Sequence, residues 1–196
     1  VDNYISSSHA FLNHSNNYTI SAWVNKTAQP TANVDTNSNP TIISVGNIYF
    51  SIFVNYDGAV GVFFYNSSNA SIYTIKSSDG AISLGDWHHV VLTWDNTSSQ
   101  LYVDGKQGYS GSVTPYNLNT AVNGKLPRIG SHASGGDSFW KGVIEEVSIF
   151  NTHLSSTEVQ ELFNDGVALD ATTHSKAGNL MGYLRNDGVI TWTDRR

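Results

Sequence analysis

The segment GDWHHVVLTWDNTSSQLYVDGK, residues 85–106, predicts two β-strands joined by a polar turn. β-branched and aromatic residues fill its two apolar runs, and the polar residues Asp, Asn, Thr and Ser separate them, which is typical of strands. The Asp-Gly pair at 104–105 is a strong short-range hairpin signal. We therefore expect strands at 87–94 and 100–104, with a tight turn after the second.

His88 and His89 stand side by side in the first of these strands. Neighbouring side chains of a strand point to opposite faces, so the two imidazoles cannot converge on one metal ion or one substrate atom. Trp87 shares a face with His89, and Val90 shares a face with His88. Since buried polar groups are nearly always paired, we predict two structural imidazoles with a hydrogen bond each.

The same alternation continues along most of the chain and predicts an antiparallel all-β fold. A second Asp-Gly hairpin is expected in NYDGAV, residues 55–60. Segments 27–40 and 107–126 show no period and predict long loops. The other expected strands are 17–26, 41–46, 48–55, 59–65, 70–76, 127–130 and 142–151.

One short helix is predicted at 154–166, where Ser155 and Glu158 have the spacing of a capping box. We expect Gly166 to end it and its apolar face to pack over the edge of a sandwich. The predicted domain is 1–166. Residues 167–196 form a tail, with 177–196 as a terminal strand pair or the start of a following module.

Composition restricts the classes of partner. The 196 residues carry a formal charge of −6, from 16 acidic and 10 basic residues, with no basic stripe for nucleic acid. No segment has the roughly 18 consecutive apolar residues of a membrane span, so membrane insertion is not expected. Charged residues make up 13% of the chain and cysteine is absent, and this polar, uncharged composition suits secreted or particle-surface proteins. Because the chain begins at Val1, we expect it to be processed or cut from a longer polypeptide.

Four blocks together resemble the laminin-G-like domains of the concanavalin A-like lectin/glucanase superfamily. They are NYTISAWV (17–24), the opening block (85–106), PRIG (127–130) and FWKGVIEEVSIFNTHLSSTEVQELF (139–163). The resemblance covers residues 1 to 166. It implies a jelly-roll β-sandwich of two antiparallel sheets, one of them concave, in which the Trp-His-His-Val block is a core strand.

Because some proteins with this fold are glucanases, catalysis has to be considered. Glycoside hydrolysis usually needs two carboxyl groups flanking the scissile bond. Glu145 and Glu146 are neighbours on a predicted strand and should face opposite ways. The Glu-x-Asp-x-x-Glu strand of those glucanases is also absent, since Val147 and Phe150 stand at its later positions when counted from Glu145. We predict no catalytic residue and no enzyme activity.

A calcium site is the favoured metal hypothesis. By analogy with the calcium-dependent pentraxins, which are similar to this family, the expected ligands are Asn47 at a strand corner and Asp137 in the loop 130–140, assisted by Ser131. Calcium prefers such oxygen ligands. A structural site joining Asp2 or Asn3 to Glu145 or Glu146 is a second option, and a zinc site at His132 is less favoured. Each residue also fits a turn former or a solvated polar group.

A saccharide needs flat aromatic faces with hydrogen-bonding groups around them. Residues expected in loops are the best candidates, although sheet packing explains many tyrosines equally well. The predicted ligand-binding residues are Tyr49, Tyr109, Tyr116, His132 and Trp140.

Two function hypotheses remain open from the sequence. The first is a noncatalytic carbohydrate-binding or adhesion module, with or without calcium, that binds glycans or glycosylated surfaces outside the cell. The second is a structural subunit of an extracellular filament, surface layer or virion, which self-associates through residues 177–196. A detached GVITWT strand at 188–193 could complete a sheet of another copy or pair within its own chain.

Overall fold

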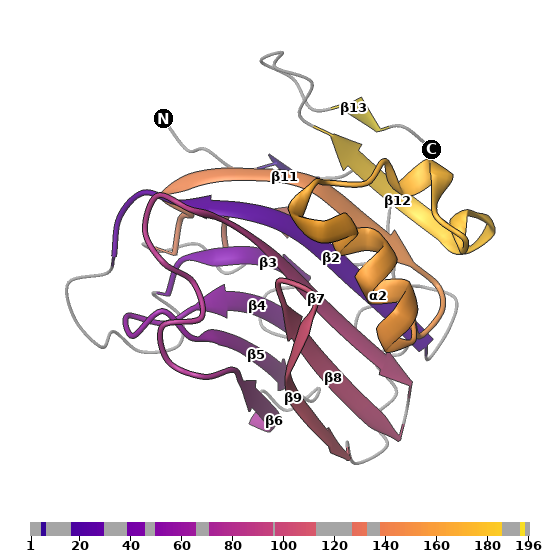
Figure 1. Cartoon of the computed structure of the whole chain (residues 1–196). Helices are drawn as coiled ribbons and strands as arrows, with labels where there is room; N and C mark the ends of the chain where they lie inside the picture. Colours follow the sequence, from indigo (N-terminus) through magenta and orange to yellow (C-terminus); the bar gives the residue numbers. More distant parts are fainter. Residues whose placement is uncertain are drawn as a thin grey trace.

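Two antiparallel β-sheets lie face to face in the computed structural model, with one helix on the outer side (Figure 1). The structure describes residues 5–6, 17–29, 39–45, 50–65, 71–95, 97–112, 127–132, 138–185 and 193–194. Sheet A consists, in spatial order, of β1 (Ile5–Ser6), β10 (Pro127–Ile129), β3 (Thr41–Val45), β4 (Phe50–Val54), β5 (Val60–Tyr65) and β6 (Ser71–Lys76). Sheet B consists of β13 (Thr193–Asp194), β12 (Leu180–Arg185), β11 (Gly142–Phe150), β2 (Asn17–Lys26), β7 (Trp87–Asp95), β8 (Ser98–Val103) and β9 (Lys106–Ser112). The predicted all-β sandwich is confirmed.

The main core lies between the two sheets and follows from strand alternation. In β7, Val90, Leu92 and Trp94 point inward, where Trp94 meets Phe64 of β5 edge to face with ring centroids 5.3 Å apart. Such aromatic pairs add stability beyond their buried area. The predicted strands are all present within one or two residues of their expected bounds.

One prediction about the loops is wrong. The predicted loop 107–126 begins with β9, which pairs with β8 through the tight turn at Asp104 and Gly105, so Tyr109 lies in a strand. Glycine and serine in KQGYSGS give little strand propensity, and pairing with β8 overrides it.

The helix α2 (Ser156–Phe163) lies over the outer face of sheet B rather than over the sandwich edge (Figure 1). Ser155 and Glu158 form the predicted capping box. The predicted end at Gly166 is wrong, because Asn164 takes the left-handed conformation first and caps the helix. Asparagine tolerates that conformation better than most residues.

A second, smaller core is sealed by the helix. Val159 and Leu162 of α2 belong to a buried cluster with side chains from four strands of sheet B. The strand residues of that cluster are Val91 of β7, Tyr102 of β8, Phe150 of β11, and Leu180 and Tyr183 of β12. The outer face of sheet B is therefore apolar where the helix covers it.

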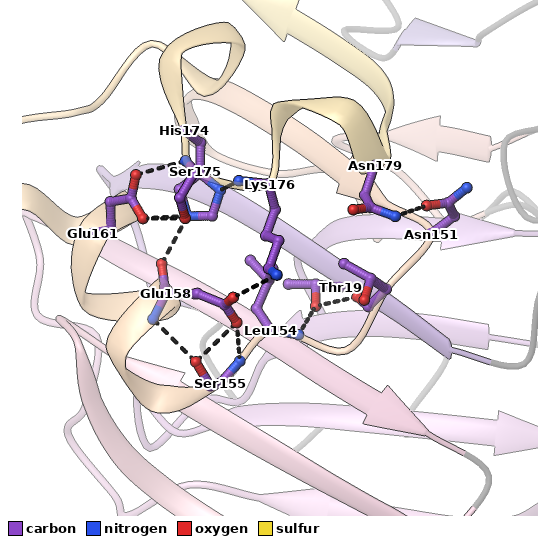
Figure 2. A network of polar contacts seen from close by, with 11 residues as sticks. Thr19, Asn151, Leu154, Ser155, Glu158, Glu161, His174, Ser175, Lys176 and Asn179 are labelled. Carbon is purple, nitrogen blue, oxygen red and sulfur yellow. Dashed lines mark hydrogen bonds and ion pairs between the residues drawn. The ribbon is translucent and has the colours of Figure 1, made fainter.

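The segment after the helix is held down by a polar network (Figure 2). It contains the single-turn helices η1 (Asn164–Gly166), η2 (Ala171–Thr173) and η3 (Ala177–Asn179). The buried His174 ring donates to the Glu158 carbonyl oxygen at 3.0 Å and accepts from the Lys176 backbone N–H at 3.0 Å. The Ser175 hydroxyl donates to Glu161 at 2.5 Å. The contacts of His174 and Ser175 thus hold the segment against Glu158 and Glu161 of α2.

The chain then returns to sheet B as β12, which pairs with β11, and β13 pairs with β12. Residues 180–185 and 193–194 are thus paired within their own chain. Residues 188–192 of the proposed assembly strand 188–193 lie outside the described residues. In the described part of the chain, no helix has the length and apolar character that crossing a membrane requires.

Strand β11 carries a bulge that corrects one sequence argument. Its pairing with β2 shifts between Glu145 and Ser148, and Glu146 has a φ of 51° in the left-handed region. Simple alternation therefore does not apply to Glu145 and Glu146. The Glu146 carboxylate accepts from the Tyr183 hydroxyl and pairs with Arg185 at 3.0 Å, which ties β11 to β12.

Candidate functional site

The outer face of sheet B continues beyond the helix, and there it is open. Register places Val143 of β11 opposite Asn25 of β2, and Asn25 opposite Trp87 of β7. These cross-strand neighbours lie on one face. With the usual spacing of about 4.8 Å between strands, Val143 and Trp87 stand about 10 Å apart.

We call this surface the Trp87 shelf and define it as Asn25, Trp87 and Val143. Trp87 is 42% exposed and Val143 38%, and they are two of the five large apolar side chains that the described part of the chain exposes. Asn25 sits between them and donates from Nδ2 to the Gly85 carbonyl oxygen at 2.8 Å. Exposed apolar side chains that lie together can form an interaction surface, so the shelf is a candidate binding site.

A stack of three rings, Trp23, His89 and Phe163, separates the shelf from the helix-covered core. The ring centroids of Trp23 and His89 are 5.1 Å apart, and those of Trp23 and Phe163 are 5.9 Å apart. The Ser21 hydroxyl lies 2.7 Å from His89 Nε2. Burial lowers the pKa of His89 to about 3, although Asp104 opposes the shift. His89 is therefore a neutral structural group.

His88 points to the other face of β7, as predicted. Its Nδ1 lies 2.8 Å from Asp104 Oδ2, and its Nε2 lies 2.8 Å from the Ser83 hydroxyl. The other Asp104 oxygen accepts from the His89 backbone N–H. Although burial alone would raise the pKa of Asp104, hydrogen bonds from His88 and His89 lower it overall. These bonds fix the start of β7, where Trp87 projects.

Glu145 borders the shelf. It follows Val143 by two residues on β11 and lies opposite Trp23, while the intervening Ile144 points into the main core. Its side chain is half-buried and, among the described residues, has no hydrogen bond or ion pair. Burial raises the pKa of Glu145, the charge of Glu146 raises it further, and Arg185 opposes both. Its carboxylate, two strands and one residue row away from the exposed indole of Trp87, can accept hydrogen bonds from a ligand long enough to span both.

The last residue of β2, Lys26, follows Asn25 of the shelf and is buried. Lys26 Nζ donates to the Gln29 side chain, and Gln29 in turn donates to the Tyr56 carbonyl oxygen at 2.8 Å. Burial lowers the pKa of Lys26 to about 8, with Asp57 opposing the shift. The strand alternation of β2 directs Lys26 inward, away from the shelf.

Three of the residues predicted for sugar binding are described by the structure, and none of them belongs to the Trp87 shelf. Trp140 is 7% exposed and belongs to the main core, where its indole N–H donates to the Val143 carbonyl oxygen at 3.2 Å. His132 is buried, and burial together with the Arg128 charge lowers its pKa. Tyr109 is half-buried against the core. Tyr49 and Tyr116 lie outside the described residues, and a binding role for all five stays a prediction.

The calcium prediction is equally open. Ser131 is buried, and its carbonyl oxygen accepts from the Ser44 hydroxyl at 3.0 Å. Asn47 and Asp137 lie outside the described residues. Within the described ranges, no group of three or more His, Asp or Glu side chains could hold a metal ion. The second option used Asp2 or Asn3, which also lie outside these ranges.

From the sequence, Trp87 was predicted to belong to a core strand and was not among the candidate site residues. A signal was available, because Trp87 directly follows the turn residues Gly85 and Asp86 and opens the strand. The first residue of a strand is the one that a short covering helix is least able to reach. Only the position of α2 shows that it ends at Phe163 and leaves Trp87 open.

Solved structures of similar fold come from several carbohydrate-active proteins. A candidate carbohydrate-binding protein from Bacteroides ovatus has a TM-score of 0.65 at 16% identity, covering 99% of this chain and 54% of that protein. The CBM40 module of the Ruminococcus gnavus IT-sialidase, bound to sialyllactose, has a TM-score of 0.62 at 18% identity, covering 79% of this chain and 86% of the module. Domain 4 of an extracellular arabinanase from Geobacillus stearothermophilus, in complex with arabinotriose, has a TM-score of 0.58 at 22% identity, covering 78% and 68%.

Sequence comparison gives one relative and a family. The adhesion G-protein coupled receptor V1 of Danio rerio is 24% identical over 176 residues, which are 86% of this chain and 3% of the receptor. The chain thus spans a small fraction of that relative. A sequence model of laminin G-like domains matches residues 1–160. The chain therefore belongs to the concanavalin A-like lectin/glucanases superfamily.

Proposed function

We propose that this chain is a noncatalytic carbohydrate-binding module that holds a glycan on the Trp87 shelf. The observation that carries the proposal is the 42% exposed indole of Trp87, mounted on a central strand of sheet B. A saccharide ring has an apolar C–H face that can stack on such an indole, and its hydroxyls can reach Asn25 and Glu145. The sialyllactose and arabinotriose complexes of structurally similar modules support this reading.

Rigidity of the site supports binding. Trp87 is flanked by β2 on one side, and the hydrogen bonds of His88 to Ser83 and Asp104 hold the chain on either side of it. A ligand that meets a preformed surface loses less conformational freedom in the complex, which favours affinity.

The noncatalytic part of the proposal rests on how the glutamates are used. Glu146 is bound to Tyr183 and Arg185, Glu158 is part of the capping box, and Glu161 is held by Ser175. Of the four glutamates only Glu145 is left near the shelf, and the other carboxylate there, Asp86, accepts from the Ser83 hydroxyl at 2.8 Å. A glycosidase normally needs two carboxyl groups across the scissile bond.

We include an extracellular or cell-surface setting and an adhesive role in the proposal. The arabinanase is described as extracellular, and the zebrafish relative is an adhesion receptor. Calcium assistance through Asn47, Ser131 and Asp137 belongs to the proposal as well. Its test is glycan binding with added calcium and again with a chelator, where loss of binding in the chelator is the expected result.

The decisive experiment compares Trp87→Ala with Tyr56→Ala. Tyr56 is also 42% exposed but lies in the β4–β5 hairpin, so it is a matched control for loss of an exposed ring. Binding of lactose, sialyllactose and arabinotriose is measured by calorimetry. We expect Trp87→Ala to weaken binding about tenfold or more, as for a central Trp anchor, and Tyr56→Ala to leave it unchanged. Equal affinity in Trp87→Ala and the unmodified protein would refute the site.

A further inference from the structure

We infer that the Trp87 shelf selects neutral glycans and disfavours acidic ones, because the Glu145 carboxylate borders the surface where the sugar stacks. The inference rests on the proposed function and names the ligand class of the same site.

Glu145 lies on the same face of sheet B as the Trp87 shelf. Alternate residues of a strand are about 7 Å apart on one face, so Glu145 stands one residue row beyond Val143. The ring stack lies beside it through Trp23, its neighbour on β2. A glycan that extends from Trp87 across Asn25 toward β11 therefore reaches this carboxylate.

The charges near Glu145 leave the surface around it negative. Glu146 is neutralised by Arg185, which also contacts Asp170 at 3.3 Å. Asp86, next to Trp87, is exposed and accepts from the Ser83 hydroxyl at 2.8 Å, and it adds a second negative charge at the shelf. The partners of Arg185 are already carboxylates, so it offers little attraction to a further anion.

Two lysines could oppose this field. Lys26 is buried on the inner side of β2, and its amino group is bound to Gln29. Lys141 is exposed, directly before β11, and is the cation to be tested. Charges in contact with solvent interact weakly because water and salt screen them, whereas half-buried Glu145 is screened less.

Recognition follows from this chemistry. An ionised carboxylate only accepts hydrogen bonds, so it pairs with the hydroxyl groups of a neutral sugar. The carboxylate of a sialic acid placed beside it meets a like charge. The net charge of −6 adds a weaker long-range repulsion of anionic ligands.

The experiment measures lactose and sialyllactose, which share the same neutral core, together with neutral arabinotriose. We expect sialyllactose to bind about fivefold to tenfold more weakly than the better neutral ligand at neutral pH and low salt. Glu145→Gln removes the charge but keeps the shape, so it should reduce that difference. Asp79→Asn is the control, since it removes an equal charge in the turn after β6, where Asp79 pairs with Lys76.

A pH titration gives an independent readout. Because the pKa of Glu145 is raised, its charge is lost at a higher pH than that of an ordinary glutamate. Acidification should therefore narrow the difference between neutral and acidic ligands in the unmodified protein, and Glu145→Gln should show no such narrowing.

The outcomes separate the two proposals. Sialyllactose binding equal to or tighter than that of both neutral sugars overturns the inference and leaves the proposed function in place. A strong loss of sialyllactose binding in Lys141→Gln also overturns it, since the lysine would then be recruiting the acid. If none of the three sugars binds, the proposed function itself fails.

Discussion

The outer face of sheet B has two parts that are formed by the same strands. One part is covered by α2, and the other is exposed to solvent. In the covered part, Val91, Tyr102 and Phe150 lie beneath α2 and the segment that follows it. In the open part, Trp87 and Val143 stand in solvent. The residue types are alike, so the difference lies in what the chain places over them.

Residues of the covered part should therefore contribute mainly to the free energy of unfolding, and residues of the open part mainly to ligand affinity. The covered part has apolar burial and the polar network of Figure 2, so a change there should alter the free energy of unfolding. The open part makes few internal contacts, so a change there should alter ligand affinity instead. The ring stack of Trp23, His89 and Phe163 is the boundary between the two.

The largest expected effect is in the covered part. Phe150→Ala empties a fully buried site and should lower the free energy of unfolding by about 3–5 kcal/mol. Val143→Ala, on the same strand but 38% exposed, should lower it by less than about 1 kcal/mol. Urea unfolding of both variants measures the contrast. Similar losses in the two would show that the open part is also covered.

His89, in the ring stack between the two parts, should make the free energy of unfolding depend on pH. His89 has a pKa near 3 in the folded chain and an ordinary value near 6.5 when unfolded, so only the unfolded chain gains a proton as the pH falls below 6.5. The free energy of unfolding therefore decreases with acidification. Between about pH 6.5 and 5 the decrease should be about 1–2 kcal/mol.

His89 makes the largest expected contribution in this pH window. The pKa of Asp95 is lowered to about 2 by its hydrogen bonds with Thr97 and Ser98, against the opposing effect of burial, so its stabilisation is lost only at lower pH. His89→Gln should flatten the dependence above about pH 5, and the buried His132, with its lowered pKa, leaves a remainder of the same sign. Urea midpoints across the window test this, and an unchanged slope in His89→Gln would contradict it.

A smaller loss in the free energy of unfolding is expected at the N-terminus of α2. Ser155→Ala removes the N-cap of α2 and should cost about 1 kcal/mol. Hydrogen exchange of the α2 amides should become faster, while glycan binding at the Trp87 shelf stays the same. Ser156→Ala, one residue later, is the control. A change in affinity with Ser155→Ala would mean that the cover and the shelf are coupled.

The smallest effect on stability is expected at the shelf itself. Trp87→Ala should change the free energy of unfolding by less than about 0.5 kcal/mol, although it is predicted to weaken glycan binding. Denaturant midpoints of this variant measure the effect. A loss above about 2 kcal/mol would place Trp87 among the structural residues and remove it from the site.

Much of the fold was predictable because strand alternation and turn chemistry are local. The β7–β8 pairing and the capping box at Ser155 and Glu158 followed from residue spacing alone. The predictions about β9, the helix end at Asn164 and the bulge at Glu146 failed, because each depends on a partner or a backbone conformation that neighbouring letters do not encode.

The candidate site was less predictable than the fold. Trp87 was taken for a core residue and Trp140 for a loop platform, whereas Trp87 is exposed and Trp140 is buried. Both are tryptophans beside turn residues, and local sequence does not distinguish them.

The amino-acid sequence by itself determined the antiparallel all-β class, the opposite directions of His88 and His89, and the negative charge of the molecule, since these follow from alternation and composition. The two-sheet sandwich was implied by the resemblance to laminin-G-like domains. Only the tertiary structure decided that α2 stops at Phe163, that Glu146 is neutralised while Glu145 is left beside the shelf, and that Trp87 is open. The physical reason is that exposure is decided by what distant segments cover, and such coverage is a property of the packed chain.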